Sequence, residues 1–282
     1  MKTGLSETAS ETTNEIMLPI VNTCKPVFFS TITVLSCPAI INAKIVLARN
    51  TFKKNSLKPM NYDQFKSNFA YKGKSVYATV FEMHTNNIKT KKQKFAVNNL
   101  EKIFKATFKI SSKIGFHEMS LRGLCQETGL SMGGIYSCIE SKDIIAIFVK
   151  DLVQHVFSEV IESALELNEP QQALDDLIRH SVYSTDILHP WFYFLYFETR
   201  SLPKDHQQDS KNIELNMIKN IELLVNKINP GKKSINSHFI ATMTLAMIQE
   251  RYLKHWKYKN DDTNIDEHAG EIIRLVHSAL SY

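Results

Sequence analysis

The residues best suited to chemistry in this chain are two serines on either side of a glycine, between Ser120 and Ile139. Ser120 and Ser131 each precede a short run with helical apolar spacing, which is the position of a helix N-cap. A capped N-terminus offers backbone N–H groups and the positive end of the helix dipole, and both favour phosphate oxygens. The spacing therefore predicts phosphate binding.

The glycine between the two serines predicts a sharp corner between two helices. Gly129 is suited to the positive φ that such a corner needs. Two short helices joined in this way have the dimensions of a helix-turn-helix, whose second helix enters the DNA major groove. We expect both helices to pack on the preceding helix through apolar side chains, namely Leu121, Leu124, Cys125, Leu130 and Ile135.

The second of these helices contains Gly133 and Gly134, which together cost about 2 kcal/mol of helix propensity relative to alanine. A helix that contains two glycines in spite of this cost is expected where its backbone must lie close to a partner. A DNA groove is one such partner, and a tightly packed neighbouring helix is the other.

The stretch from Ile103 to Ile145 resembles the DNA-binding domain of tetracycline-repressor-type (TetR/AcrR) regulators. The matching residues are Gly115-Phe116, Ser120, Gly129-Leu130-Ser131, Gly133, Tyr136 and Ser141-Lys142. The resemblance covers roughly fifty residues directly. Three positions depart from the family pattern. Ile139 stands where Phe is favoured, Cys138 where a polar residue or His is common, and Gly134 where a small hydroxyl residue is frequent.

The resemblance implies a set of DNA contacts. Phosphate contacts would come from Ser120, Arg122, Tyr136 and Lys142, with Ser131 at the start of the second helix, and groove contacts from Met132, Gly133, Gly134 and Ser137. Because few of the groove residues can read a base edge, we expect DNA shape to contribute to specificity. Lys89, Lys91, Lys92 and Lys94 either add backbone or minor-groove contacts or form a solvated tail.

The rest of the chain after residue 90 predicts an all-α body with no alternating strand pattern. Capping residues, glycines and prolines divide it into nine expected helices. These cover 97–114, 121–128, 132–138, 142–167, 170–188, 190–201, 203–229, 234–258 and 265–281. We assign 95–157 to the DNA-binding domain and 158–282 to an effector-binding and dimerisation domain.

Charge is distributed unevenly around a net value of +5. Residues 49–94 hold eleven Lys and Arg against two acidic residues, whereas 95–282 hold twenty basic and twenty-four acidic residues. This indicates a polyanionic partner at one end or, alternatively, a solvated basic linker. The four cysteines lack a C-x-x-C spacing, which favours a reducing cytoplasm, with no disulfide framework and no structural zinc.

The first 82 residues show no clear helical period and no motif, so we expect residues 1–90 to be a poorly structured extension or the start to be assigned too early, with Met83 or Met60 as alternatives. Residues 26–43 are uncharged and raise the possibility of a membrane helix. Pro38 and several polar residues argue against it, so a membrane partner is not expected.

An effector site is expected in the body, where residues 191–200 read WFYFLYFETR and are aromatic on every side. Such a helix either forms plain core or walls a pocket for a small apolar molecule. The resemblance favours a pocket. The candidate ligand residues are Tyr183, Trp191, Phe194, Tyr196, Phe197 and Glu198.

The last two helices carry apolar stripes, and the resemblance implies that they form a homodimer interface. The stripes comprise Phe239, Met243, Leu245, Met247 and Ile248, then Ile272, Ile273, Val276 and Leu280. A dimer multiplies the specificity of one short helix over two half-sites.

Together these features predict a ligand-responsive regulator of double-stranded DNA, with repression as the expected mode. The sequence contains no H-E-x-x-H or phosphate-loop motif, and a G-x-S-x-G match at Gly129–Gly133 falls within the predicted helix-turn-helix, so we expect no catalytic residues, cofactor or metal. The alternative is a protein-interaction or membrane-tethered factor built on the same fold.

Overall fold

The computed structural model describes residues 59–231, 236–259 and 264–281. No strand occurs in these ranges, which confirms the all-α prediction. The α-helices are α2 (Tyr62–Asn68), α3 (Ser75–Met83), α4 (Gln93–Ile114), α5 (Leu121–Thr128), α6 (Met132–Tyr136), α7 (Lys142–Leu165), α8 (Pro170–Ile187), α9 (His189–Glu198), α10 (Lys204–Ile228), α11 (Ser237–Leu253) and α12 (Ile265–Ser281). Two short 3-10 helices are η1 (Thr199–Ser201) and η2 (His255–Lys259).

The helices begin and end close to the capping residues, glycines and prolines that predicted their boundaries. Gly115 ends α4 with a φ of 81°, and Pro170 occupies the first turn of α8. A proline there loses no intrahelical hydrogen bond, because the N–H groups of the first turn have no partner within the helix. The main difference is that the helix expected over 234–258 begins at Ser237 and ends at Leu253, with η2 following it.

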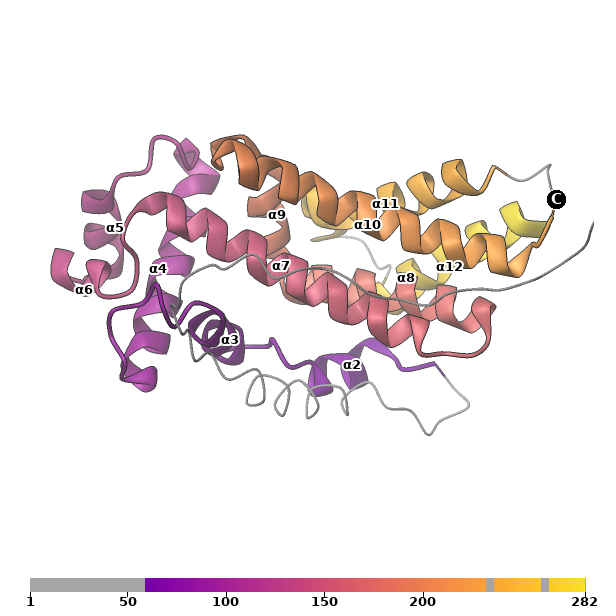
Figure 1. Cartoon of the computed structure of the whole chain (residues 1–282), viewed down its shortest axis with the longest axis horizontal. Coiled ribbons are helices and arrows are strands. Elements are labelled where there is room, and N and C mark those ends of the chain that lie inside the picture. Colours follow the sequence, from indigo (N-terminus) through magenta and orange to yellow (C-terminus); the bar gives the residue numbers. More distant parts are fainter. Residues whose placement is uncertain (1–58, 232–235, 260–263, 282) are drawn as a thin grey trace, which may run out of the picture.

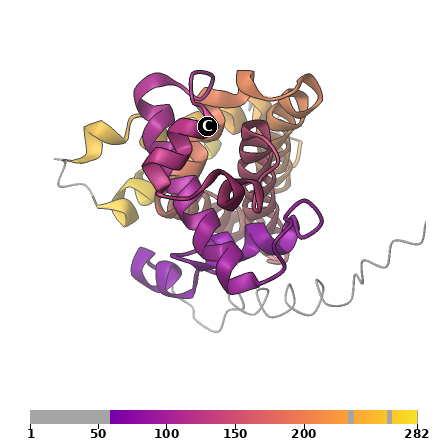
Figure 2. The ribbon, with the colours of Figure 1, turned by 90° about the vertical axis from the view of Figure 1, so that its left-hand side faces the viewer.

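The helices form two groups that α7 connects (Figure 1). The short helices α5 and α6 lie with α4 at one end of the molecule, and the view onto that end shows them in front (Figure 2). The long helices α8, α10, α11 and α12 lie side by side at the other end, and α9 lies between the groups (Figure 1).

Residues 59–90, which we call the N-terminal strap, correct the prediction that the chain is poorly structured up to residue 90. They form α2 and α3 and bury a large apolar set: Phe65, Phe69, Tyr71, Val76, Tyr77, Val80, Phe81 and Ile88. The helices are seven and nine residues long, with a left-handed turn at Gly73 between them. Segments this short contain too few turns for a clear helical period to emerge in the sequence.

The first part of the strap is bound to the body. The Tyr62 hydroxyl donates to Asp186 Oδ2 at 2.7 Å, and the Tyr62 backbone N–H donates to Asp266 Oδ1 at 2.9 Å. The Phe65 ring stacks on the His180 ring at a centroid separation of 5.0 Å. These contacts fix α2 against α8 and α12.

The second part of the strap contacts the other group of helices, at α4, α7 and the end of α6. Helix α3 packs along α4, and His84 stacks on Phe148 of α7 at 3.9 Å. Burial lowers the pKa of His84, although the nearby Asp151 carboxylate opposes that shift. The Thr90 backbone N–H donates to the carbonyl of Ser137, directly after α6, at 3.1 Å. One segment therefore touches both groups of helices.

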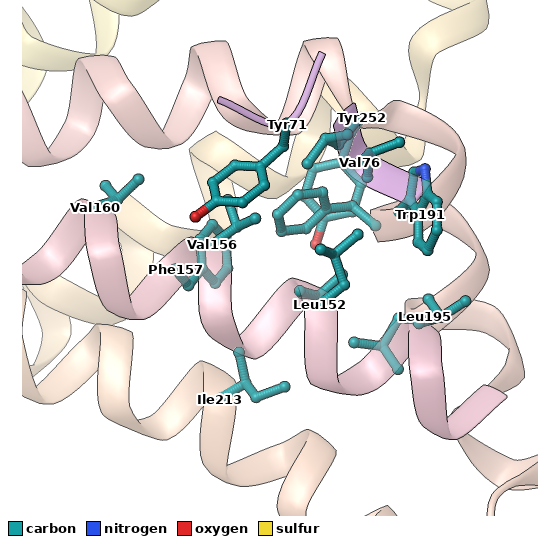
Figure 3. Packing of buried hydrophobic residues seen from close by; sticks show 14 of the residues in the cluster. Tyr71, Val76, Leu152, Val156, Phe157, Val160, Trp191, Leu195, Ile213 and Tyr252 are labelled. Carbon is teal, nitrogen blue, oxygen red and sulfur yellow. The ribbon is translucent and has the colours of Figure 1, made fainter. Parts of the chain in front are cut away.

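The strap belongs to the same hydrophobic core as the body. Figure 3 shows Tyr71 and Val76 of the strap beside Leu152 and Val156 of α7, close to Trp191 of α9. The uncharged stretch at 26–43 lies outside the described residues. Among the helices in the described ranges, none combines the length and the apolarity required to cross a bilayer.

Candidate nucleic-acid interface

The hinge between α5 and α6 has the geometry expected from the sequence. Gly129 adopts a φ of 69°, in the left-handed region that favours glycine, and its N–H donates to the Cys125 carbonyl at 2.9 Å. The Thr128 hydroxyl donates to the Leu124 carbonyl at 2.7 Å and accepts the Leu130 N–H at 3.2 Å. The turn is therefore held by local hydrogen bonds.

Both predicted serine caps are present. Ser120 Oγ accepts the Gly123 N–H and Ser131 Oγ accepts the Gly134 N–H, each at 3.1 Å. Each bond satisfies one of the N–H groups that a helix leaves unpaired in its first turn. The caps thus define where α5 and α6 begin.

The inner faces of the two helices are packed on α4. Leu124 and Ile135 are fully buried, together with Phe116 and Met119 from the loop before α5. Cys138 and Ile139 are also buried, and burial raises the pKa of the Cys138 thiol. Two of the three departures from the family pattern therefore affect packing in the interior.

The outer surface of this unit carries most of the predicted DNA-contact residues. Ser120, Arg122, Ser131, Gly133 and Tyr136 are exposed, and the Tyr136 residue keeps 42% of its surface accessible. Met132, Gly134 and Ser137 are half-buried. The Ser137 hydroxyl donates to the Gly134 carbonyl at 2.7 Å, so it also stabilises the end of α6.

Lys142 has a structural role that the sequence did not reveal. Its ammonium group donates to three backbone carbonyls of the loop before α5, those of Phe116 (3.4 Å), His117 (2.5 Å) and Met119 (3.2 Å). These bonds tie the first residue of α7 to the helix-turn-helix. A phosphate contact from Lys142, as the resemblance implies, would have to share the ammonium group with these carbonyls.

The basic residues before α4 lie beside the end of α6, because the Thr90 to Ser137 hydrogen bond joins the two segments. Lys91 donates to the carbonyls of Thr85 at 2.7 Å and Ile88 at 3.0 Å, so its ammonium group stabilises the loop between α3 and α4. Lys89, Lys92 and Lys94 are exposed.

The helical body contains a cavity of about 440 Å³ among α7, α9, α10 and α11, which we call the body cavity. Phe157, Leu195, Ile213 and Tyr252 line it, and Figure 3 labels these four among the buried side chains. Its polar lining includes Lys211, Glu214 and Gln249. The size lies in the range of small-molecule sites.

A separate cavity of about 500 Å³ lies between α4 and α9, which we call the junction cavity. It shares no lining residue with the body cavity. Its lining comprises Phe108, Ser111, Ser112, His189, Pro190, Tyr193, Phe194, Phe197, Glu198 and Arg200.

Some of the predicted ligand residues line one of these two cavities, and others line neither. Tyr196 lines the body cavity, whereas Phe194, Phe197 and Glu198 line the junction cavity. Trp191 lines neither, because it packs on Phe104, Phe108 and Tyr77. Tyr183 also lines neither. Its hydroxyl donates to Asp266 and its ring contacts Tyr62 and Phe65.

Within the described ranges, no three His, Cys, Asp or Glu side chains gather in a way that could hold a metal ion. Cys125 and Cys138 are free thiols, and Cys24 and Cys37 lie outside the described residues.

No family model matches the chain, and no curated protein matches it in sequence. Solved structures do match its fold. The TetR-family regulator PfmR from Thermus thermophilus is 19% identical with a TM-score of 0.53, and the match covers 62% of this chain and 96% of that one. A TetR-family regulator from Bordetella parapertussis is 14% identical with a TM-score of 0.56, covering 62% and 92%.

A third similar structure is AibR in complex with isovaleryl coenzyme A and operator DNA. It is 13% identical with a TM-score of 0.54, and the match covers 62% of this chain and 96% of AibR. The described chain therefore has the fold of TetR-family transcriptional regulators. Nearly all of each regulator is matched, while more than a third of this chain lies outside each match.

Proposed function

We propose that this protein is a ligand-responsive DNA-binding transcriptional regulator. In our proposal it is a cytoplasmic homodimer that represses from a palindromic operator and is released by a small apolar molecule. The observation that carries the proposal is the serine-capped, glycine-hinged helix pair, which presents the outer face of α6 at one end of the molecule. That face is free to enter a major groove.

In this proposal the residues act in two groups. Ser120, Arg122 and Tyr136 contact phosphates and fix the orientation of the unit on the duplex. Met132, Gly133, Gly134 and Ser137 lie toward the groove, where the two glycines allow the backbone to approach closely. Since these side chains offer few hydrogen-bonding groups, shape and deformability of the DNA supply part of the specificity.

The body cavity is the proposed effector site. Its aromatic and aliphatic walls suit an apolar molecule, and Lys211, Glu214 and Gln249 can orient a polar end. Because AibR was solved with isovaleryl coenzyme A, short acyl thioesters are the first compounds to test. Loss of DNA binding on adding such a compound would support release by a small-molecule effector.

Dimerisation is proposed through the outward faces of α11 and α12. Phe239 and Met243 of α11 and Leu275 of α12 expose 60%, 41% and 55% of their surfaces, so both helices present apolar side chains outward. Part of the predicted stripe is excluded from this role. Leu245, Ile248, Ile272, Ile273, Val276 and Leu280 are buried within the chain itself.

Met243→Glu is expected to raise the dissociation constant of the dimer at least about 100-fold, because two-fold symmetry brings a pair of new charges into one apolar interface. Sedimentation velocity at micromolar concentration measures this change. Met83→Glu is the matched control, since Met83 is 39% exposed but lies on α3. A dimer that persists in Met243→Glu would contradict this interface.

Tyr136→Phe is expected to weaken operator binding about tenfold, since a hydroxyl-to-phosphate hydrogen bond is lost. The operator is first isolated by selecting duplexes from a random pool with the full chain, and binding is then measured by gel shift. Tyr196→Phe is the control, because Tyr196 is 45% exposed and distant in sequence from the helix pair. Failure to enrich any duplex would count against the proposed function as a whole.

A further inference from the structure

We propose that the junction cavity is a second ligand site, specific for a planar aromatic molecule that carries an anionic group. The inference rests on the proposed function only for its regulatory consequence. Binding itself is independent of DNA.

Helix α9 separates two distinct sites. Phe192, Leu195 and Tyr196 face the body cavity, whereas Pro190, Tyr193, Phe194 and Phe197 face the junction cavity. Each set follows helical spacing on its own side of α9. This explains why the segment is aromatic all round. One face alone would suffice for an ordinary core helix or for the wall of one pocket.

The walls of the junction cavity favour a flat aromatic ligand. Phe108, Tyr193, Phe194 and Phe197 contribute four rings to a space of about 500 Å³. Phe197 keeps 46% of its surface exposed although its ring contacts Tyr193 at 4.6 Å. An exposed ring at the mouth of an aromatic cavity offers a face on which another ring can stack.

Arg200 supplies a cation for an anionic group. It lines the cavity and is exposed, so a ligand seated there can reach its guanidinium. Glu198 is the one acidic residue in the lining, and its Oε1 already accepts the Phe116 backbone N–H at 3.2 Å. His189 is also engaged, with Nε2 at 3.0 Å from the Tyr252 carbonyl.

The cavity adjoins the contacts that join the helix-turn-helix unit to the body. Phe194 meets Phe108 of α4 at 5.6 Å and Phe116 at 5.1 Å, both edge-on, and the Glu198 to Phe116 hydrogen bond lies at the same junction. A ligand seated here contacts α4 and α9 together. It would therefore change how the helix-turn-helix is held, and with it the affinity for DNA.

The test uses 8-anilinonaphthalene-1-sulfonate, an aromatic sulfonate that fluoresces when bound, titrated into the full chain. Phe197→Ser and Arg200→Gln are each expected to weaken binding about fivefold, through the loss of a stacking face and of an exposed ion pair. Phe95→Ser is the matched control, because Phe95 is an exposed phenylalanine (53%) on α4 that lines neither cavity.

A neutral analogue, N-phenyl-1-naphthylamine, provides the second arm and should bind the wild type and Arg200→Gln equally. The proposal is overturned if the sulfonate does not bind, if Phe95→Ser weakens its binding as much as Phe197→Ser, or if Arg200→Gln has no effect. Because Arg200 is on the surface, its replacement keeps the test valid even if Phe197→Ser misfolds. These outcomes are read without DNA, so they remain distinct from failure of the proposed regulatory function.

Discussion

Gly133→Glu is expected to lower the affinity for the operator at least about 100-fold, while the protein remains folded. Gly133 is exposed on α6, and a Cβ added there would find its nearest neighbour, Ser131 Oγ, at 4.0 Å. The helix therefore accepts a side chain without a clash. A carboxylate on the face of α6 that we propose enters the groove would be repelled by the phosphates of both strands, and like-charge contacts of this kind cost several kcal/mol.

The comparison with Gly133→Ala separates charge from shape. Alanine is the better helix former by about 1 kcal/mol, so this variant should be at least as stable as the wild type. If the glycine is required for close approach of the backbone, Gly133→Ala also loses affinity, though less than Gly133→Glu. Gel shifts and thermal melts on all three proteins provide the measurement. Wild-type affinity in Gly133→Glu would show that α6 does not face DNA.

Phe65→Ala is expected to lower the free energy of unfolding by about 3–5 kcal/mol, the range for truncating a buried phenylalanine. Phe65 is 1% exposed, and its ring contacts Phe69, His180 and Tyr183. The loss therefore falls on the contact between α2 and α8. Urea denaturation followed by circular dichroism measures it.

Asn68→Ala is the control for this prediction, because Asn68 is exposed near the end of the same helix. Its effect should stay within about 0.5 kcal/mol, as for most surface substitutions. If Phe65→Ala unfolds at the same urea concentration as the wild type, the strap is not part of the cooperative unit. A shift of the whole transition would show that the strap and the body unfold together.

The interface was predictable where its signals are local. A serine cap, a positive-φ glycine and a run of apolar residues at helical spacing act within a few residues, so Ser120, Gly129 and Ser131 marked the helix pair. The structure confirms the hinge and both caps. Long helices such as α7 and α10 were predicted for the same reason, since many turns repeat one pattern.

Long-range contacts decided the remaining features. Lys142 resembled a phosphate-binding lysine, yet its ammonium group reaches carbonyls more than twenty residues earlier. No local pattern encodes that distance. Trp191 and Tyr183 were candidate ligand residues by type, but they pack against α4 and the strap respectively, because chain segments distant in sequence cover them.

The sequence by itself determined the helical class, the boundaries of most helices and the hinged pair that carries the proposed function. These depend on caps, turns and periodicity, which a short window of residues contains. Only the tertiary structure decided that the strap is integral and that α9 divides two cavities. Burial and cavity shape arise from which helix faces meet, and that is a property of the whole packed chain.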